Sequence, residues 1–229
     1  METITFSLGN REEVVRFEKF LFQYAEYKAQ FALKHISLVD AYDQLKTRED
    51  GGRIFTAILD VQINFILVCL DFNMVGAIWN GSFSKGKLEG GSILDSEEKF
   101  FGKMEIHRYS TSYILRYRAL WDKLLGLLIL IESPEDYEEF IGSRSKNKSF
   151  RKIANRNKNI PCDVVQSLEA ILTNFDDKFR TAEAHGTGLL RKYSFTMESM
   201  ANTPQIELIR YWNFLNEIIT KLGETLKKK

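Results

Sequence analysis

The stretch VVQSLEAILTNFDDKFRTAEAH, residues 164–185, holds the clearest structural pattern in the chain. Its apolar residues recur at intervals of three or four positions, which places them on one face of an α-helix. Pro161 before them is favoured at the start of a helix, and Gly186 after them is favoured at its end. The stretch therefore predicts an amphipathic helix over 161–180 with a turn beyond it. The expected buried stripe is Val164, Val165, Leu168, Ile171, Leu172, Phe175 and Phe179.

Similar helical spacing covers most of the remaining chain. Proline marks two further helix starts, at Ser133-Pro134 and at Thr203-Pro204, and the last helix is expected to end at Gly223. The sequence therefore predicts an all-α helical bundle, with residues 1–229 forming a single domain. The other expected segments are 10–47 with a kink near His35–Ser37, 53–75, and about Glu105 to Glu132.

Two stretches interrupt this pattern. Gly76 to Gly102 is rich in glycine, serine and mixed charges, which predicts a long irregular mid-chain loop. Ser143 to Asn159 has little apolar content and predicts a basic, polar connector that is either a solvated loop or an RNA-capturing segment. Its cations are Arg144, Lys146, Lys148, Arg151, Lys152, Arg156 and Lys158.

Composition narrows the classes of function. The net charge of +1 provides no overall field to attract nucleic acid, so a nucleic-acid site would have to be a local patch. Cys69 and Cys162 are far apart, which favours free thiols in a reducing cytosol, and the start METITFSLGNREE lacks a signal-peptide pattern. We therefore expect a cytoplasmic protein. The three histidines and two cysteines show no metal-ligand spacing, so no metal site is expected.

The apolar segment from Ile54 to Trp79 is long enough to cross a bilayer. It contains Asp60 and Asp71, and each charge near a membrane centre costs about 2.5–3.5 kcal/mol. A buried core helix is therefore the better interpretation, and no membrane association is expected.

Tyrosines recur at four-residue spacing in the third helix, among several arginines. Tyr109, Tyr113 and Tyr117 share one helix face, which is typical of a core or a protein interface. Stacking on single-stranded RNA is the alternative for this basic, aromatic face.

Arg180 and His185 are the candidate catalytic residues. Arginine stays charged and holds a phosphate through two parallel hydrogen bonds, whereas histidine exchanges its proton near neutral pH. Together they offer what metal-free RNA cleavage needs. A five-residue separation is about 140° on a continuous helix, so the helix must end, kink or tighten between them. The alternative is a solvated surface arginine beside a histidine that caps the end of the helix.

The segment from Phe179 to Gly186, at the end of a long amphipathic helix, resembles the HEPN superfamily (higher eukaryotes and prokaryotes nucleotide-binding). The signature of that superfamily is an arginine, four to six residues, and a histidine. In bacterial HEPN-like families the motif continues into a Gly-Thr-Gly and an Arg-Lys-aromatic run, as in Gly186–Tyr193 here. The specific resemblance covers roughly 160–195 within a motif region of about 160–227. Active members most often carry Asn, Asp or His after the arginine, where this chain has Thr181.

The resemblance implies a metal-independent endoribonuclease that uses no cofactor. His185 would take a proton from the ribose 2′-hydroxyl or donate one to the 5′-oxygen, and Arg180 would stabilise the charge on the phosphoryl oxygens. Thr181 would orient the phosphate, and Arg191 and Lys192 would bind the flanking RNA backbone. The resemblance also implies a homodimer, and a role in a toxin–antitoxin or antiviral defence system with an antitoxin or defence protein as partner.

Two other functions remain open at this point. The first is a non-catalytic module of the same fold that binds a partner protein or a nucleotide. The second is an interaction scaffold unrelated to HEPN proteins.

Overall fold

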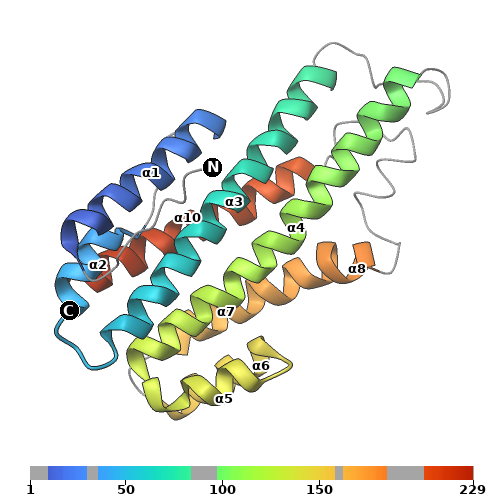
Figure 1. The fold of residues 1–229 in the computed structure, drawn as a ribbon. Helices are drawn as coiled ribbons and strands as arrows, with labels where there is room; N and C mark the ends of the chain where they lie inside the picture. The colour runs from blue at the N-terminus through green and yellow to red at the C-terminus, as the bar shows by residue number, and fades with distance from the viewer. Residues whose placement is uncertain (1–9, 30–35, 84–96, 158–161, 185–203, 229) are drawn as a thin grey trace.

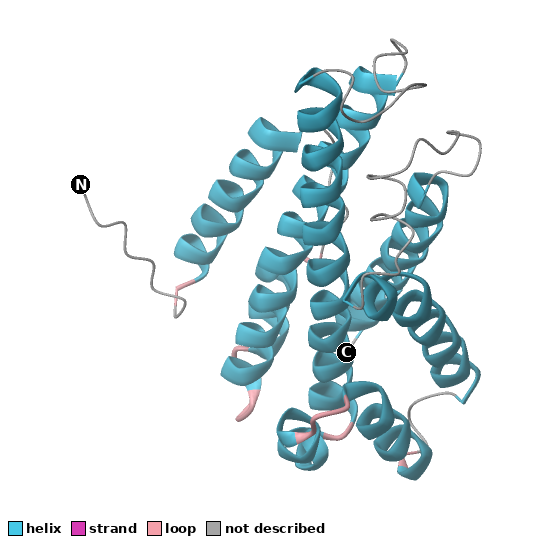
Figure 2. Ribbon diagram, turned by 90° about the vertical axis from the view of Figure 1, so that its right-hand side faces the viewer, coloured by secondary structure: helices cyan, strands magenta, loops and turns pink. Residues whose placement is uncertain are grey.

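The computed structural model describes residues 10–29, 36–83, 97–157, 162–184 and 204–228. Within these ranges every regular element is a helix, as Figure 2 shows, which confirms the all-α class predicted from the sequence. The helices are α1 (Arg11–Ala29), α2 (Leu38–Leu45), α3 (Gly51–Phe83), α4 (Glu97–Glu132), the 3-10 turn η1 (Pro134–Asp136), α5 (Tyr137–Gly142), α6 (Lys146–Arg156), α7 (Cys162–Phe175), the π-helical turn η2 (Asp176–Arg180), α8 (Thr181–Ala184) and α10 (Pro204–Lys228).

The two longest helices, α3 and α4, run antiparallel and form the centre of the bundle (Figure 1). Helices α1 and α2 pack against α3, whereas α5, α6 and the π turn pack against α4. Glu18 of α1 ties the first three helices together, because its carboxylate accepts hydrogen bonds from the Leu38 amide (2.7 Å) and from Gln62 of α3 (3.0 Å). Close to the expected kink near His35–Ser37, α2 begins at Leu38 and is capped by the Ser37 hydroxyl, while residues 30–35 lie outside the described part.

Aromatic side chains join α10 to the central pair. Trp212 stacks on Phe65 and Phe72 of α3, at ring-centroid distances of 5.6 and 5.0 Å. Tyr117 of α4 is fully buried, and its hydroxyl donates a hydrogen bond of 2.8 Å to the carbonyl of Tyr211. These contacts pack one face of the C-terminal helix against the core. The tyrosine face predicted to be core is buried at Tyr113 and Tyr117, which confirms that interpretation for these two residues.

Helix α3 behaves as the core helix predicted for the apolar segment. Its portion Gly51–Met74 is long and apolar enough to cross a membrane by length and composition, and 50% of the most apolar window is buried inside the bundle. Ile54, Ile58 and Val68 have no exposed surface and pack against neighbouring helices. The arrangement is compatible with a soluble protein.

Several predicted boundaries were wrong. The segment 76–102 was expected to be irregular, but α3 continues to Phe83 and α4 begins at Glu97; residues 84–96 lie outside the described part. The last helix continues past Gly223 to Lys228, because one glycine inside a helix costs only about 1 kcal/mol. The 143–159 connector contains helix α6, whose buried Phe150, Ile153 and Ala154 form a short apolar stripe among exposed cations.

Candidate functional site

The helix that carries the predicted motif does not end at Arg180. After α7 the backbone widens into the π turn Asp176–Arg180 and then continues as α8, Thr181–Ala184, so the predicted end at residue 180 was wrong. The Thr181 amide donates to the Asp176 carbonyl, five residues back, which is the π-helical pattern. Single π turns occur mostly inside α-helices and often at functional sites.

Phe179 fixes the backbone immediately before the motif. Its ring is fully buried and lies 5.4 Å from the ring of Phe175 and 5.8 Å from that of Tyr211. Tyr211 is held in turn by the hydrogen bond from Tyr117 and by its own hydroxyl, which donates to Asn174 of α7. The predicted stripe is also buried at Val165, Leu168, Leu172 and Phe175. The core therefore determines the position of residue 180, although the Arg180 side chain is itself outside the core.

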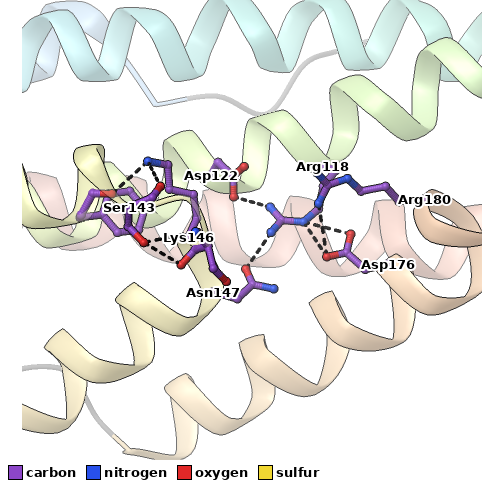
Figure 3. A network of polar contacts seen from close by, with 9 residues as sticks. Arg118, Asp122, Ser143, Lys146, Asn147, Asp176 and Arg180 are labelled. Atoms are coloured by element: carbon purple, nitrogen blue, oxygen red, sulfur yellow. Dashed lines mark hydrogen bonds and ion pairs between the residues drawn. The ribbon is translucent and has the colours of Figure 1, made fainter. Parts of the chain in front are cut away.

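Arg180 and Thr181 lie at the surface. The Arg180 side chain is 49% exposed, and its Nη1 lies 3.7 Å from Asp176 Oδ2. That distance permits an ion pair but not a hydrogen bond. Asp176 is hydrogen-bonded to a different arginine, because both of its carboxylate oxygens accept from Nε of Arg118 at 3.1 Å (Figure 3).

Arg118 of α4 is the buried centre of this polar cluster. Only 5% of the residue is exposed, and burial of a charge is costly unless it is paired and hydrogen-bonded. Besides Asp176, its guanidinium donates to Asp122 of α4 and, at 2.8 Å, to Asn147 of α6. The cluster of Arg118, Asp122, Asn147, Asp176 and Arg180, hereafter the Arg118 cluster, therefore joins α4, α6 and the π turn beside the motif (Figure 3).

The role of Arg118 was not apparent from the sequence. It is one of the arginines among the tyrosines of the third helix, but it lies inside the protein and pairs with two carboxylates. The four-residue spacing from Arg118 to Asp122 is the one signal that could have indicated an ion pair. The partners Asn147 and Asp176 lie 29 and 58 residues away, and no local pattern predicts such contacts.

Helix α6 lies beside the motif, since Asn147 contacts the same arginine as Asp176 does. Most cations of the predicted basic connector are engaged within the fold. Lys146 donates to the carbonyls of Phe140, Ile141 and Ser143 at the end of α5, Arg151 pairs with Glu169, and Lys152 and Arg156 both pair with Glu139.

Hydrogen bonds from Lys152 and Arg156 lower the pKa of Glu139 to about 2. Within the described residues, Arg144 and Lys148 are exposed and have no acidic partner. Among the described residues of the connector, the cations without an acidic partner are therefore fewer than the sequence suggested, and Lys158 lies outside the described part.

The other predicted site residues, His185, Arg191 and Lys192, lie outside the described part of the chain. The structure therefore shows the arginine half of the motif and the residue that follows it. Among the residues it does describe, no group of His, Cys, Asp and Glu side chains is arranged to hold a metal ion.

Two shallow surface hollows, of about 360 and 480 Å³, flank the start of α3. Gly52 and Thr56 line both, and neither includes a residue of the motif or of the Arg118 cluster. Comparisons of the chain with protein-family models, with curated proteins and with solved structures found no match.

Proposed function

We propose that this protein is a metal-independent endoribonuclease of HEPN type, in which Arg180 and His185 act on one RNA phosphate. The observation that carries this proposal is the state of Arg180. Its backbone follows a fully buried phenylalanine, yet its guanidinium is half exposed and makes no hydrogen bond within the described part of the chain. A cation that is held at a fixed place with unused donors is suited to bind a phosphate.

In the proposed reaction His185 transfers a proton and Arg180 stabilises negative charge. His185 acts either as a neutral base that takes the proton of the ribose 2′-hydroxyl or, in its protonated form, as an acid that donates a proton to the departing 5′-oxygen, and such proton transfer contributes about 10²–10⁴-fold to the rate. Arg180 stabilises the negative charge that develops on the phosphoryl oxygens. The products are a 2′,3′-cyclic phosphate and a 5′-hydroxyl end. Thr181, exposed at the start of α8, would orient the phosphate through its hydroxyl.

RNA would extend from the motif over nearby cations. Arg191 and Lys192 are proposed to bind the backbone on one side. Exposed Lys148, next to the Asn147 that binds Arg118, is a candidate on the side of α6. From the resemblance, we also propose a cytoplasmic homodimer that works in a toxin–antitoxin or antiviral defence system.

The alternative is a non-catalytic helical module of the same fold that binds a partner protein or a nucleotide. Two observations favour it. Arg180 is already paired electrostatically with Asp176, and Thr181 occupies the position where active HEPN proteins most often carry Asn, Asp or His. A module of this kind would bind its ligand without cleaving RNA.

The test is RNA cleavage by the full chain in the presence of EDTA. We expect cleavage by the wild type, a loss of at least about 100-fold in both Arg180→Ala and His185→Ala, and cyclic-phosphate products. Matched controls are Arg108→Ala, which removes another exposed arginine, and His107→Gln, which removes another histidine; both should retain activity. Cleavage that needs a metal, or that survives both motif substitutions, would refute the mechanism.

A further inference from the structure

Asp176 faces two arginines that differ in environment. The buried Arg118 donates to both carboxylate oxygens at 3.1 Å, whereas the half-exposed Arg180 lies 3.7 Å from one of them (Figure 3). Arg118 is therefore hydrogen-bonded to the carboxylate, and Arg180 is attracted to it only through charge.

The two arginines also differ in what they can still bind. Each of the three guanidinium nitrogens of Arg118 donates a hydrogen bond, to Asp176, Asp122 and Asn147, and the Arg118 side chain is 6% exposed. Arg180 has five N–H donors, and it forms no hydrogen bond within the described residues. An incoming anion can therefore engage Arg180 but has no access to Arg118.

We propose that Asp176 is an internal substitute for the substrate phosphate. It holds the Arg180 side chain near the site in the free protein and releases it to the RNA. This inference rests on the function proposed above. Asp176 is then a positioning residue, because it acts on the reaction only through Arg180.

Arg118 lowers the free-energy cost of releasing Arg180 from Asp176. Without it, the departure of Arg180 would leave a carboxylate that is only 19% exposed with no counter-charge. With Arg118 hydrogen-bonded to both oxygens, Asp176 keeps one positive partner in both states. Breaking the pair with the half-exposed Arg180 then costs about as much as breaking a surface ion pair, which corresponds to about a 1.4- to 5-fold change in affinity.

The experiment measures binding of a fluorescent single-stranded RNA by anisotropy, with His185→Ala in every protein so that no RNA is cleaved. Asp176→Asn keeps an oxygen acceptor for Arg118 but removes the charge. We expect it to tighten RNA binding by about 1.4- to 5-fold, and to do so only when Arg180 is present. In an Arg180→Ala background the same substitution should give no gain. In the protein that retains His185, Asp176→Asn should lower KM without raising kcat.

The matched control is Asp122→Asn. Asp122 is also bonded to Arg118, and its substitution changes the net charge equally, but it has no ion pair with Arg180. Its effect on RNA affinity should therefore be the same with and without Arg180. If Asp176→Asn fails to fold by circular dichroism, Asp176→Ser, which still accepts a hydrogen bond, is judged by the same criterion.

Two results would overturn the inference. If Asp176→Asn gives no gain, or gives an equal gain in the Arg180→Ala background, Asp176 does not compete for Arg180. In that case the proposed function still stands, provided that Arg180→Ala alone weakens RNA binding. If Arg180→Ala leaves RNA binding unchanged, the proposed function fails and this inference fails with it.

Discussion

Two tyrosines one helical turn apart on α4 give a sharp test of how the C-terminal helix packs. Tyr113 and Tyr117 are both fully buried, with their ring centroids 5.6 Å apart. The Tyr117 hydroxyl donates to the Tyr211 carbonyl of α10 at 2.8 Å, whereas the Tyr113 hydroxyl has no hydrogen-bond partner among the described residues. Burial raises the pKa of both hydroxyls, so both are neutral at physiological pH.

Replacing each tyrosine with phenylalanine removes one oxygen from the same kind of buried ring, so the apolar contributions to stability cancel between the two variants. Tyr117→Phe loses a hydrogen bond worth about 0.5–1.5 kcal/mol net. Tyr113→Phe removes an unpaired buried hydroxyl, which costs the wild type about 1–3 kcal/mol. We therefore expect Tyr113→Phe to be more stable than the wild type, Tyr117→Phe to be less stable, and the two to differ by about 2 kcal/mol or more.

The assay is urea unfolding of the full chain followed by far-ultraviolet circular dichroism. Equal m values for the three proteins would show that the midpoints report stability and not a change in the surface exposed on unfolding. If Tyr117→Phe were as stable as the wild type, α10 would not lie against Tyr117 as described. If Tyr113→Phe were destabilised as much as Tyr117→Phe, the Tyr113 hydroxyl would have a partner, and the reasoning would be refuted.

Two further predictions concern charge. Lys148→Ala should reduce the slope of log affinity for single-stranded RNA against log salt concentration by about 0.7, which corresponds to the loss of one phosphate contact. The control is Lys152→Ala, which removes a lysine of the same helix, α6, that is paired with Glu139 of α5; it should leave the slope unchanged. Equal slopes for the wild type and both variants would exclude Lys148 from the RNA path. Burial raises the pKa of Asp71 above its ordinary 3.8, although the hydrogen bond from Ser112 and the charge of Arg116 act in the opposite direction. The folded state therefore disfavours the charged form of Asp71, and the wild type loses stability as the pH rises through the raised pKa. Asp71→Asn should therefore gain stability relative to the wild type between about pH 4 and pH 7 in urea unfolding, and a constant difference across that range would contradict the assignment.

The helices could be predicted from the sequence where a residue pattern was strong. Five residues of the predicted stripe, Val165, Leu168, Leu172, Phe175 and Phe179, are buried, as their spacing indicated, whereas Ile171 is partly buried. The third long helix ends at Glu132, as predicted. Helix α6 was missed because only Phe150, Ile153 and Ala154 are apolar in a stretch dominated by cations. Three apolar residues make a helix only when a neighbouring surface is present to bury them, and the local sequence does not show that surface.

Part of the candidate site could likewise be predicted from the sequence, and part could not. Arg180 and Thr181 could be selected from the sequence, because an arginine followed five residues later by a histidine is a local pattern. That Arg180 is half exposed, that Asp176 faces it, and that Arg118 neutralises Asp176 from inside the protein could not be selected in this way. Asp176 also lies in a π turn, which shifts the side chains after it away from the phase of a regular α-helix.

The order of apolar and polar residues was enough to predict that this chain is helical and which face of α7 is buried, because the period of a helix is a local property. Only the tertiary structure decided which charges meet. Arg118, Asn147 and Asp176 come from three separate helices, and the burial of one guanidinium among them depends on how those helices pack. The physical reason is that the energy of an ion pair depends on distance and on access to water, and packing determines both.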